Sequence, residues 1–193
     1  PAQTEVVFGE VADFVDITEN GVAFHVPVVG GQKTGWFYDH RDSRAVFAHY
    51  CRGKRVLDVY SYLGGWGLQA MSSGAESVTC IDSSASALAQ AEVSAIKAGF
   101  DSQMRFLKGS AIDVLKSLIR KNLIFDVIVL DPPAFIKRRK DQRSGENAYH
   151  HINQLAIKLL AESGLLVSAS CSLHLPRCLL YTSDAADDRS WVD

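Results

Sequence analysis

One short stretch constrains the fold more than any other part of the sequence, namely residues 55–67, which read R-V-L-D-V-Y-S-Y-L-G-G-W-G. It starts as an apolar run, as expected for a strand buried on both faces of a parallel sheet. Small residues follow, and Gly64-Gly65 opens a helical pattern. A strand, a glycine turn and a helix N-terminus together present backbone N–H groups to a nucleotide-like ligand. Asp82 ends the next apolar run, at about the spacing of a ribose-binding carboxylate, which favours a nucleoside site over a plain tight turn.

Strand-like and helical runs alternate after residue 55. The strand-like runs are Arg55–Tyr60, Ser77–Ile81, Met104–Leu107, Asp126–Leu130 and Gly164–Ala169. The helical runs are about Gly65–Ser73, Ala85–Ala98, Ile112–Lys121 and Asn147–Ala161, and Gly99 stops the second of them. This alternation predicts an α/β fold with a doubly wound, Rossmann-like parallel sheet, whose ligand lies at the carboxyl ends of the strands.

The part of the chain before residue 36 reads as a small β-hairpin region. Apolar residues precede and follow Asn20-Gly21, namely Val11, Phe14, Val15 and Ile17 before it and Val22, Phe24 and Val26 after it. Asn-Gly between such runs is the strongest short hairpin signal. A polar connector follows, and a helix is expected to begin within residues 36–44, to run to about Arg52 and to end with Gly53 in the C′ position.

We therefore expect three parts: residues 1–35 as the hairpin region and connector, residues 36–175 as the main domain, and residues 176–193 as a tail. The periodicity is lost after Ser172, and no further strands can be read there. We interpret the tail as foreign, frame-shifted or disordered sequence that follows a truncated main domain.

The composition is that of an ordinary globular protein of 193 residues, with 47% hydrophobic and 22% charged residues. The net charge of −2 gives no general sign of nucleic-acid binding, so any such surface has to be local. No apolar run is long enough to span a membrane, and no secretory signal opens the sequence. The four cysteines, Cys51, Cys80, Cys171 and Cys178, show neither a C-x-x-C pair nor metal-ligand spacing, which fits free thiols in a reducing cytosol.

Two strand ends carry residues that can do chemistry. Asp131-Pro132-Pro133-Ala134-Phe135 ends the fourth strand, and its prolines predict a stiff exit with the carboxylate at the ligand edge. A rigid loop with a capping Asp is the alternative, but such an acid–Pro–Pro exit is common on the substrate side of methyltransferases. Cys171 follows the fifth strand among small residues and is either a nucleophile or an ordinary packed thiol. For Cys51 and Cys80 we expect core packing.

A basic run follows the Asp131 loop, at Lys137, Arg138, Arg139, Lys140 and Arg143. It is either a solvated loop or, together with Arg41 and Arg44, a surface that meets RNA phosphates.

Four motifs in order carry a resemblance to a known family: K-T-G-W-F-Y-D-H-R-D-S-R, Y-S-Y-L-G-G-W-G, D-P-P-A-F and S-C-S. Over roughly residues 5–175 the chain resembles the class I S-adenosylmethionine-dependent RNA methyltransferases of the bacterial 23S rRNA 5-methylcytosine type. Members typically carry an N-terminal PUA domain, then a β-hairpin region, then the methyltransferase domain. The resemblance implies S-adenosyl-L-methionine as cofactor, RNA as partner, no metal, and a main domain that is a methyltransferase domain.

The resemblance also implies roles for residues. Cys171 would attack carbon 6 of a flipped-out cytosine, and Asp131 would contact the base near ring nitrogen 3. The implied cofactor-binding residues are Lys33, Thr34, Asp58, Tyr60, Ser61, Tyr62, Gly64, Gly65, Asp82, Ser83, Ser110, Ala111 and Asp131, with Gln32 beside them. The implied RNA-binding residues are Arg41, Lys137, Arg138, Arg139 and Lys140.

The sequence departs from the common class I pattern at two places. Tyr60 and Tyr62 occupy glycine positions of the first turn, and Ser110 replaces the acidic residue of a G-D-A motif, which predicts weaker cofactor binding. Two other functions stay open: an rRNA guanine methyltransferase that needs no cysteine, and a non-catalytic cofactor- or RNA-binding module.

Overall fold

The computed structural model describes residues 8–29, 31, 35–172 and 175. The segment before the sheet contains β1 (Phe14–Glu19), β2 (Val22–Pro27), a 3-10 turn η1 (Tyr38–His40) and α1 (Arg41–His49). The remaining elements are β3 (Arg55–Val59), α2 (Gly65–Ser72), β4 (Ser77–Asp82), α3 (Ala85–Ala98), β5 (Met104–Lys108), α4 (Ala111–Arg120), β6 (Phe125–Leu130), η2 (Arg139–Asp141), α5 (Gln142–Ile157) and β7 (Leu160–Ser168). The predicted Lys33 and Thr34 and the tail 176–193 lie outside the described residues.

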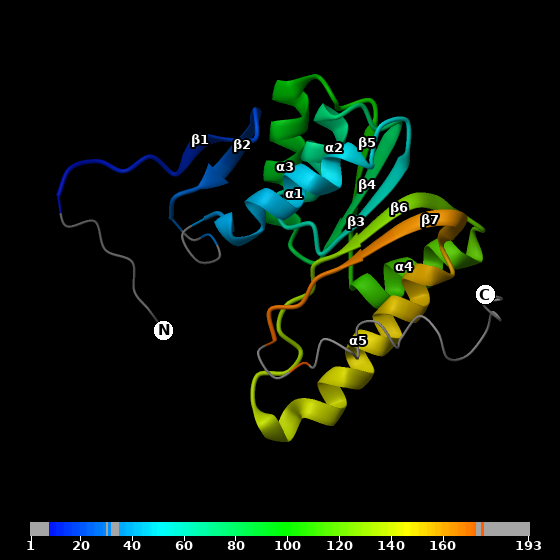
Figure 1. Cartoon of the computed structure of the whole chain (residues 1–193). Coiled ribbons are helices and arrows are strands. Elements are labelled where there is room, and N and C mark those ends of the chain that lie inside the picture. The colour runs from blue at the N-terminus through cyan, green and yellow to red at the C-terminus, as the bar shows by residue number, and fades with distance from the viewer. Residues whose placement is uncertain (1–7, 30, 32–34, 173–174, 176–193) are drawn as a thin grey trace.

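The five strands of the main sheet are all parallel and follow the order β5-β4-β3-β6-β7. Helices α1, α2 and α3 cover one face together with the hairpin, and α4 and α5 cover the other (Figure 1). The predicted doubly wound fold is therefore confirmed. After β3 the chain adds β4 and β5 on one side of that strand, and it then crosses over to add β6 and β7 on the other side of β3. Open α/β sheets bind their ligands at such a switch point.

Alternating side chains of the central strands divide the core into two clusters. Val56, Val78 and Val127 pack beneath the hairpin, α1, α2 and α3, whereas Leu57 and Ile128 pack against α4 and α5. A strand directs successive side chains to opposite faces, so a sheet that is covered twice needs apolar residues at nearly every central position. The continuous apolar runs in the sequence meet this requirement.

The N-terminal hairpin is formed as predicted. Asn20 (φ 50°) and Gly21 (φ 81°) occupy the left-handed region, which a two-residue turn between twisted strands requires. The inner face of β2, with Val22, Phe24 and Val26, is buried in the same cluster as α2 and α3. Val11 precedes β1 and does not belong to the strand.

Three predicted helix boundaries are wrong, one in α1 and two in α5. Helix α1 ends at His49 rather than near Arg52, and Gly53 (φ 66°) lies in the following turn, where its N–H donates to the carbonyl oxygen of Gly74 (2.7 Å). Helix α5 spans Gln142–Ile157 rather than Asn147–Ala161, because pairing of Leu160 with Phe125 of β6 draws the end of the predicted helix into β7. The first turn of α5, Q-R-S-G-E, is polar and contains a glycine, so no helical pattern can be read there.

The closest approach between α2 and the sheet occurs at Gly67, which leads to a prediction about stability. A methyl group on Gly67 would lie 2.9 Å from Sγ of Cys80 and 3.0 Å from Cγ1 of Val78, both in the buried strand β4. We expect Gly67→Ala to lower the free energy of unfolding by about 1–3 kcal/mol, as overpacking of a core does. Urea unfolding measures this effect. Ser72→Ala, at the exposed end of the same helix, is the control and should change stability by less than about 0.5 kcal/mol; equal stability of Gly67→Ala and the wild type would contradict the packing.

Candidate active site

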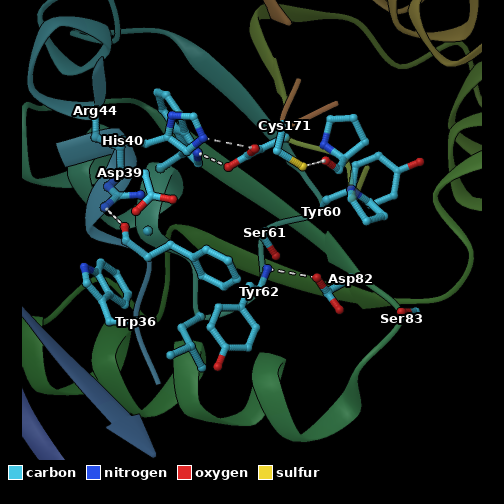
Figure 2. A pocket seen from close by; sticks show the side chains of 17 residues that line it. Trp36, Asp39, His40, Arg44, Tyr60, Ser61, Tyr62, Asp82, Ser83 and Cys171 are labelled. Atoms are coloured by element: carbon cyan, nitrogen blue, oxygen red, sulfur yellow. Dashed lines mark hydrogen bonds and ion pairs between the residues drawn. The ribbon is translucent and has the colours of Figure 1, made fainter. Parts of the chain in front are cut away.

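A pocket of about 320 Å³ opens at the carboxyl ends of the central strands. It collects residues that follow β3, β4, β6 and β7, together with side chains of segment 36–44 and of α2 (Figure 2). Eight of the predicted site residues line it: Tyr60, Ser61, Tyr62, Gly65, Asp82, Ser83, Asp131 and Cys171. The structure thus brings the glycine-turn region and the two chemically active strand ends to one cavity.

The turn after β3 adopts a glycine-like backbone even though tyrosines occupy two of its positions. Tyr60 (φ 66°) and Tyr62 (φ 49°) lie in the left-handed region, which costs a side-chain-bearing residue about 1–2 kcal/mol. The N–H groups of Tyr60 and Ser61 both donate to the carbonyl oxygen of Ile81, at 2.9 and 3.0 Å, and these bonds hold the turn against β4. Backbone strain of this kind persists where the surrounding structure enforces it, and it is concentrated at functional sites.

Burial raises the pKa of Tyr60 to about 12, with a smaller contribution from Tyr149. The Tyr60 phenol is therefore neutral at physiological pH and offers an O–H donor beside the pocket.

Asp82 fixes the other side of the turn. One carboxylate oxygen accepts the N–H of Tyr62 (2.9 Å), and the other accepts the N–H of Ser84 (2.8 Å) at the start of α3. Figure 2 shows Asp82 and Ser83 on one side of the pocket, with Trp36, His40 and Arg44 on the opposite side. Each carboxylate oxygen of Asp82 keeps a second lone pair, which a hydroxyl donor of a ligand can use.

Asp58 lies below the pocket rather than in its wall. Its side chain is completely buried, Oδ2 accepts the N–H of Gly67 (2.9 Å), and Oδ1 has no hydrogen-bond partner among the described residues. Burial raises the pKa of Asp58 to about 7; the Gly67 N–H opposes this shift, and the negative charges of Asp131 and Asp82 add to it.

Three more predicted cofactor residues, Gly64, Ser110 and Ala111, are not part of the pocket wall. Gly64 (φ 74°) is the N-cap of α2 and lies close to α3, where a methyl group would be 3.2 Å from Cβ of Ala91. Ser110 is the exposed N-cap of α4, and Ala111 is buried in that helix. Their cofactor-binding roles, like that of Asp58, remain predictions.

Asp131 and Cys171 both line the pocket, because they follow the neighbouring strands β6 and β7. Oδ2 of Asp131 accepts the indole N–H of Trp66 (3.0 Å), and Nε2 of His40 lies 3.5 Å from Oδ1. The Cys171 thiol is exposed and makes a weak contact to the carbonyl oxygen of Pro132, with sulfur and oxygen 3.9 Å apart. In contrast, Cys51 and Cys80 are buried, as predicted.

Sequence reasoning missed the pocket residues contributed by segment 36–44 and α2, namely Trp36, Phe37, Asp39, His40, Arg44 and Trp66. All but Trp66 belong to the motif K-T-G-W-F-Y-D-H-R-D-S-R, which carried the resemblance. The resemblance placed only Lys33 and Thr34 of this motif at the cofactor, and the pocket positions of the residues after them were not predicted.

The prediction that Arg44 faces RNA is wrong. Arg44 is 3% exposed, and its Nε and Nη2 donate to the two carboxylate oxygens of Glu19, at 2.7 and 3.0 Å. Its Nη2 also donates to the carbonyl oxygen of Phe37 (2.6 Å). The charge of Arg44 is therefore used inside the protein, where it supports the pocket wall.

The other predicted RNA-binding residues are exposed and lie outside the pocket. Arg41 opens α1, and Lys137, Arg138, Arg139 and Lys140 lie between the end of β6 and the start of α5. Arg138 is paired with Asp141 at 3.2 Å on the surface. Within the described part of the chain, no group of three or more His, Cys, Asp or Glu side chains is arranged to hold a metal ion. No helix among the same residues is long and apolar enough to cross a membrane.

Comparisons with known proteins agree with this geometry. A family model described as S-adenosylmethionine-dependent methyltransferase matches residues 1–183. A protein of Aeromonas salmonicida (strain A449) named ribosomal RNA large subunit methyltransferase I is 38% identical over 190 residues, which cover 96% of this chain and 48% of the relative. The protein of the same name from Vibrio cholerae serotype O1 is 39% identical over 179 residues, 90% of this chain and 45% of the relative. The chain thus spans about half the length of the curated relatives it matches.

A solved structure has the same fold. The putative methyltransferase SMU.776, complexed with SAH, aligns with a TM-score of 0.82 at 24% identity and covers 97% of this chain and 51% of that chain.

The buried carboxyl group of Asp58 predicts a distinctive pH dependence. The folded state binds its proton more tightly than the unfolded state, because the pKa rises from 3.8 to about 7 on folding. The contribution of Asp58 to stability is therefore complete below about pH 4 and is lost as the pH rises to about 7. Asparagine does not titrate, so between about pH 4 and pH 7 the free energy of unfolding of Asp58→Asn should rise relative to that of the wild type, by up to about 4 kcal/mol. Above about pH 7 the difference between the two proteins should stay constant.

Urea unfolding at several pH values measures this difference, and Asp126→Asn provides a control of opposite sign. The Arg55 guanidinium lowers the pKa of Asp126, so its contribution is present above about pH 4 and is lost in acid. A stability difference between Asp58→Asn and the wild type that does not change with pH would contradict the buried, unpaired carboxyl group.

Proposed function

The chain belongs to the family of S-adenosylmethionine-dependent methyltransferases, and from that premise we propose that it forms 5-methylcytosine in large-subunit ribosomal RNA through a covalent adduct with Cys171. The observation that carries this proposal is that Asp131 and Cys171, which follow adjacent strands, line the same pocket. An acid that contacts the base and a thiol that attacks it have to reach the same ring, and this arrangement allows both to do so.

The residues of the pocket fit the cofactor. A volume of about 320 Å³ is within the usual range of small-molecule sites. The carboxylate of Asp82 can accept hydrogen bonds from ribose hydroxyls. Ser61 lines the pocket, and its buried hydroxyl has no hydrogen-bond partner among the described groups apart from a weak interaction with the thiol of Cys80. In this proposal Tyr60, Ser61, Tyr62, Asp82 and Ser83 hold the cofactor.

The reaction divides between two side chains. The sulfur of Cys171 forms a bond to carbon 6 of the cytosine, and the electron pair of the 5,6 double bond makes carbon 5 nucleophilic. S-adenosylmethionine, when bound, supplies the methyl group that carbon 5 takes up. Carbon 5 then gives its proton to solvent, the 5,6 double bond returns and the Cys171 sulfur leaves as a thiolate, its own proton having gone to solvent when the sulfur attacked. Asp131, as a carboxylic acid, donates its proton to ring nitrogen 3, which offsets the negative charge that the ring gains in the attack, and takes the proton back when the sulfur leaves.

Trp66 and His40 support the role of Asp131. The indole N–H of Trp66 fixes Oδ2, and His40 lies beside Oδ1, so the carboxyl group has one preferred orientation before the base arrives. A preoriented group of this kind loses no further rotational freedom when the reaction occurs.

An RNA substrate is supported by the names of the relatives and by the exposed basic residues Lys137, Arg138, Arg139 and Lys140. This basic segment begins near the end of the Asp131 loop, and phosphates of an RNA strand bound at the pocket would pass near it. We assign Arg41, on α1, to the same surface. Ribosomal RNA as substrate implies a cytoplasmic enzyme.

The covalent route predicts the effect of Cys171→Ala. We expect this variant to lose at least about 1,000-fold in methyl transfer to ribosomal RNA, as removal of a nucleophile does, while cofactor binding is retained. Transfer of a labelled methyl group in single turnovers, followed by nucleoside mass mapping, measures both the rate and the modified base. Cys51→Ala removes a buried thiol outside the pocket and serves as the control with retained activity.

The rival functions give different results in the same experiment. Retained transfer by Cys171→Ala, with methylguanosine as the product, would identify a guanine methyltransferase that needs no cysteine. A wild-type protein that binds cofactor or RNA but transfers no methyl group would be a binding module.

A further inference from the structure

We propose that Tyr149 is a positioning residue for the methyl-transfer reaction: its hydroxyl, through Ser170 and Ser172, directs the Cys171 sulfur into the pocket. This inference rests on the proposed function, because it concerns how the nucleophile of that reaction is oriented. We refer to Tyr149, Ser170 and Ser172 as the hydroxyl clasp.

The two serines that flank Cys171 both reach the Tyr149 hydroxyl. The N–H of Ser172 donates to Oγ of Ser170, as in a serine turn, so the backbone turns at Cys171. Cys171 lines the pocket, whereas Ser170 and Ser172 contact the α5 side of the sheet through Tyr149. The direction of the thiol thus follows from where its two neighbours are held.

Three hydrogen bonds close the clasp. The Ser170 hydroxyl donates to the Tyr149 hydroxyl (2.9 Å), and the Tyr149 and Ser172 hydroxyls are 2.9 Å apart. The N–H of Ser172 donates to Oγ of Ser170 (3.1 Å). The Tyr149 hydroxyl therefore has a partner on each side of the cysteine. Because the Tyr149 hydroxyl is buried, its loss would remove one hydrogen bond from each of the two serine hydroxyls.

The anchor itself is fixed by the core. Tyr149 is 3% exposed in the middle of α5, and its ring packs against Phe135 with centroids 4.7 Å apart. A buried aromatic ring has few rotamers, so the position of its hydroxyl is defined by the helix.

The same clasp also holds the loop that carries Asp131. The N–H of Ile136, five residues after Asp131, donates to Oγ of Ser172 (3.2 Å). Helix α5 approaches this loop closely at Gly145, where a methyl group would lie 2.9 Å from the carbonyl oxygen of Phe135. The two loops that bear the reacting groups are thus joined to each other and to one helix.

Among the described residues, few other contacts hold Cys171. Strand β7 ends at Ser168, and after it the N–H of Ala169 donates to the carbonyl oxygen of Leu130 (2.8 Å). Within the same part of the chain, the thiol itself makes one weak contact, to Pro132. The clasp is therefore the main described support of the sulfur, and misplacement of a reacting group by about 1 Å costs on the order of 100-fold in rate.

The test follows formation of the covalent adduct in the full-length protein. Ribosomal RNA transcribed with 5-fluorocytidine is the probe: Cys171 can bond to carbon 6 and carbon 5 can be methylated, but fluorine replaces the hydrogen that has to leave carbon 5 as a proton. The enzyme then stays attached to the RNA and migrates with it on a denaturing gel. We expect Tyr149→Phe to slow single-turnover adduct formation by about 10- to 100-fold at saturating RNA and cofactor, with unchanged RNA and cofactor affinities.

Two further variants separate positioning from general loss of structure. Ile152→Val truncates a buried side chain one turn along α5 without touching the clasp, and should lower stability while leaving the rate of adduct formation unchanged. Ser170→Ala opens the clasp from the other side, and should slow the reaction as Tyr149→Phe does. Because these two groups act as one unit, the double variant should be no slower than the slower single variant. If Tyr149→Phe fails to fold, Ser170→Ala provides the same measurement.

Each other outcome overturns the inference in a recognisable way. Rapid adduct formation by Tyr149→Phe and Ser170→Ala, equal to that of the wild type, would refute the clasp and leave the proposed function intact. A loss of rate that Ile152→Val shares, or that comes with weaker RNA binding, would make Tyr149 a merely structural residue. A wild-type protein that forms no adduct would refute the proposed function, and the clasp as a device for the nucleophile with it.

Discussion

The buried ion pair between Glu19 and Arg44 is the interaction on which the pocket depends. Glu19 is 2% exposed, and its carboxylate accepts two N–H groups of Arg44 and the indole N–H of Trp36 (2.9 Å). A buried carboxylate is tolerated only when it is paired and hydrogen-bonded, so these three residues have to stay together. Because Glu19 ends the first hairpin strand, this ion pair joins the hairpin to segment 36–44. The backbone carbonyl oxygen of Glu19 also accepts the side-chain amide N–H of Gln69 (2.8 Å), which joins the hairpin to α2.

Contacts of the Glu19–Arg44 ion pair extend through two tryptophans to Asp131. The Arg44 guanidinium lies 5.1 Å from the ring centre of Trp36 and 5.9 Å from that of Trp66, and the Trp66 indole N–H holds Asp131. The hairpin therefore contributes to orienting Asp131, although it precedes the parallel sheet in the sequence. On the α5 side of the sheet, Tyr149 and its two serines support Cys171. Each of the two proposed catalytic residues is thus supported by a different group of polar contacts.

The elements that local patterns determine could be predicted from the sequence. Asn20-Gly21 identified the hairpin, the alternating runs identified the doubly wound sheet, and positions at strand ends brought Asp131 and Cys171 to one edge. The errors arose where distant residues decide the outcome. Arg44 has the surroundings of an exposed helical arginine in the sequence, and only its pairing with Glu19 buries it. The end of α5 was misplaced because strand pairing with β6 overrides its helical pattern, and the role of Tyr149 was invisible because its partners are more than 20 residues away.

Calorimetric titration with S-adenosylhomocysteine tests most directly whether the pocket at this edge of the sheet is the cofactor site. We expect one molecule to bind per chain. Binding should be at least about tenfold weaker in Asp82→Asn, because this change removes the carboxylate charge that would accept hydrogen bonds from ribose hydroxyls. Binding should be unchanged in the control Asp126→Asn, because Asp126 pairs with Arg55 outside the pocket. No heat of binding in the wild type, or equal affinity of the wild type and Asp82→Asn, would contradict the account.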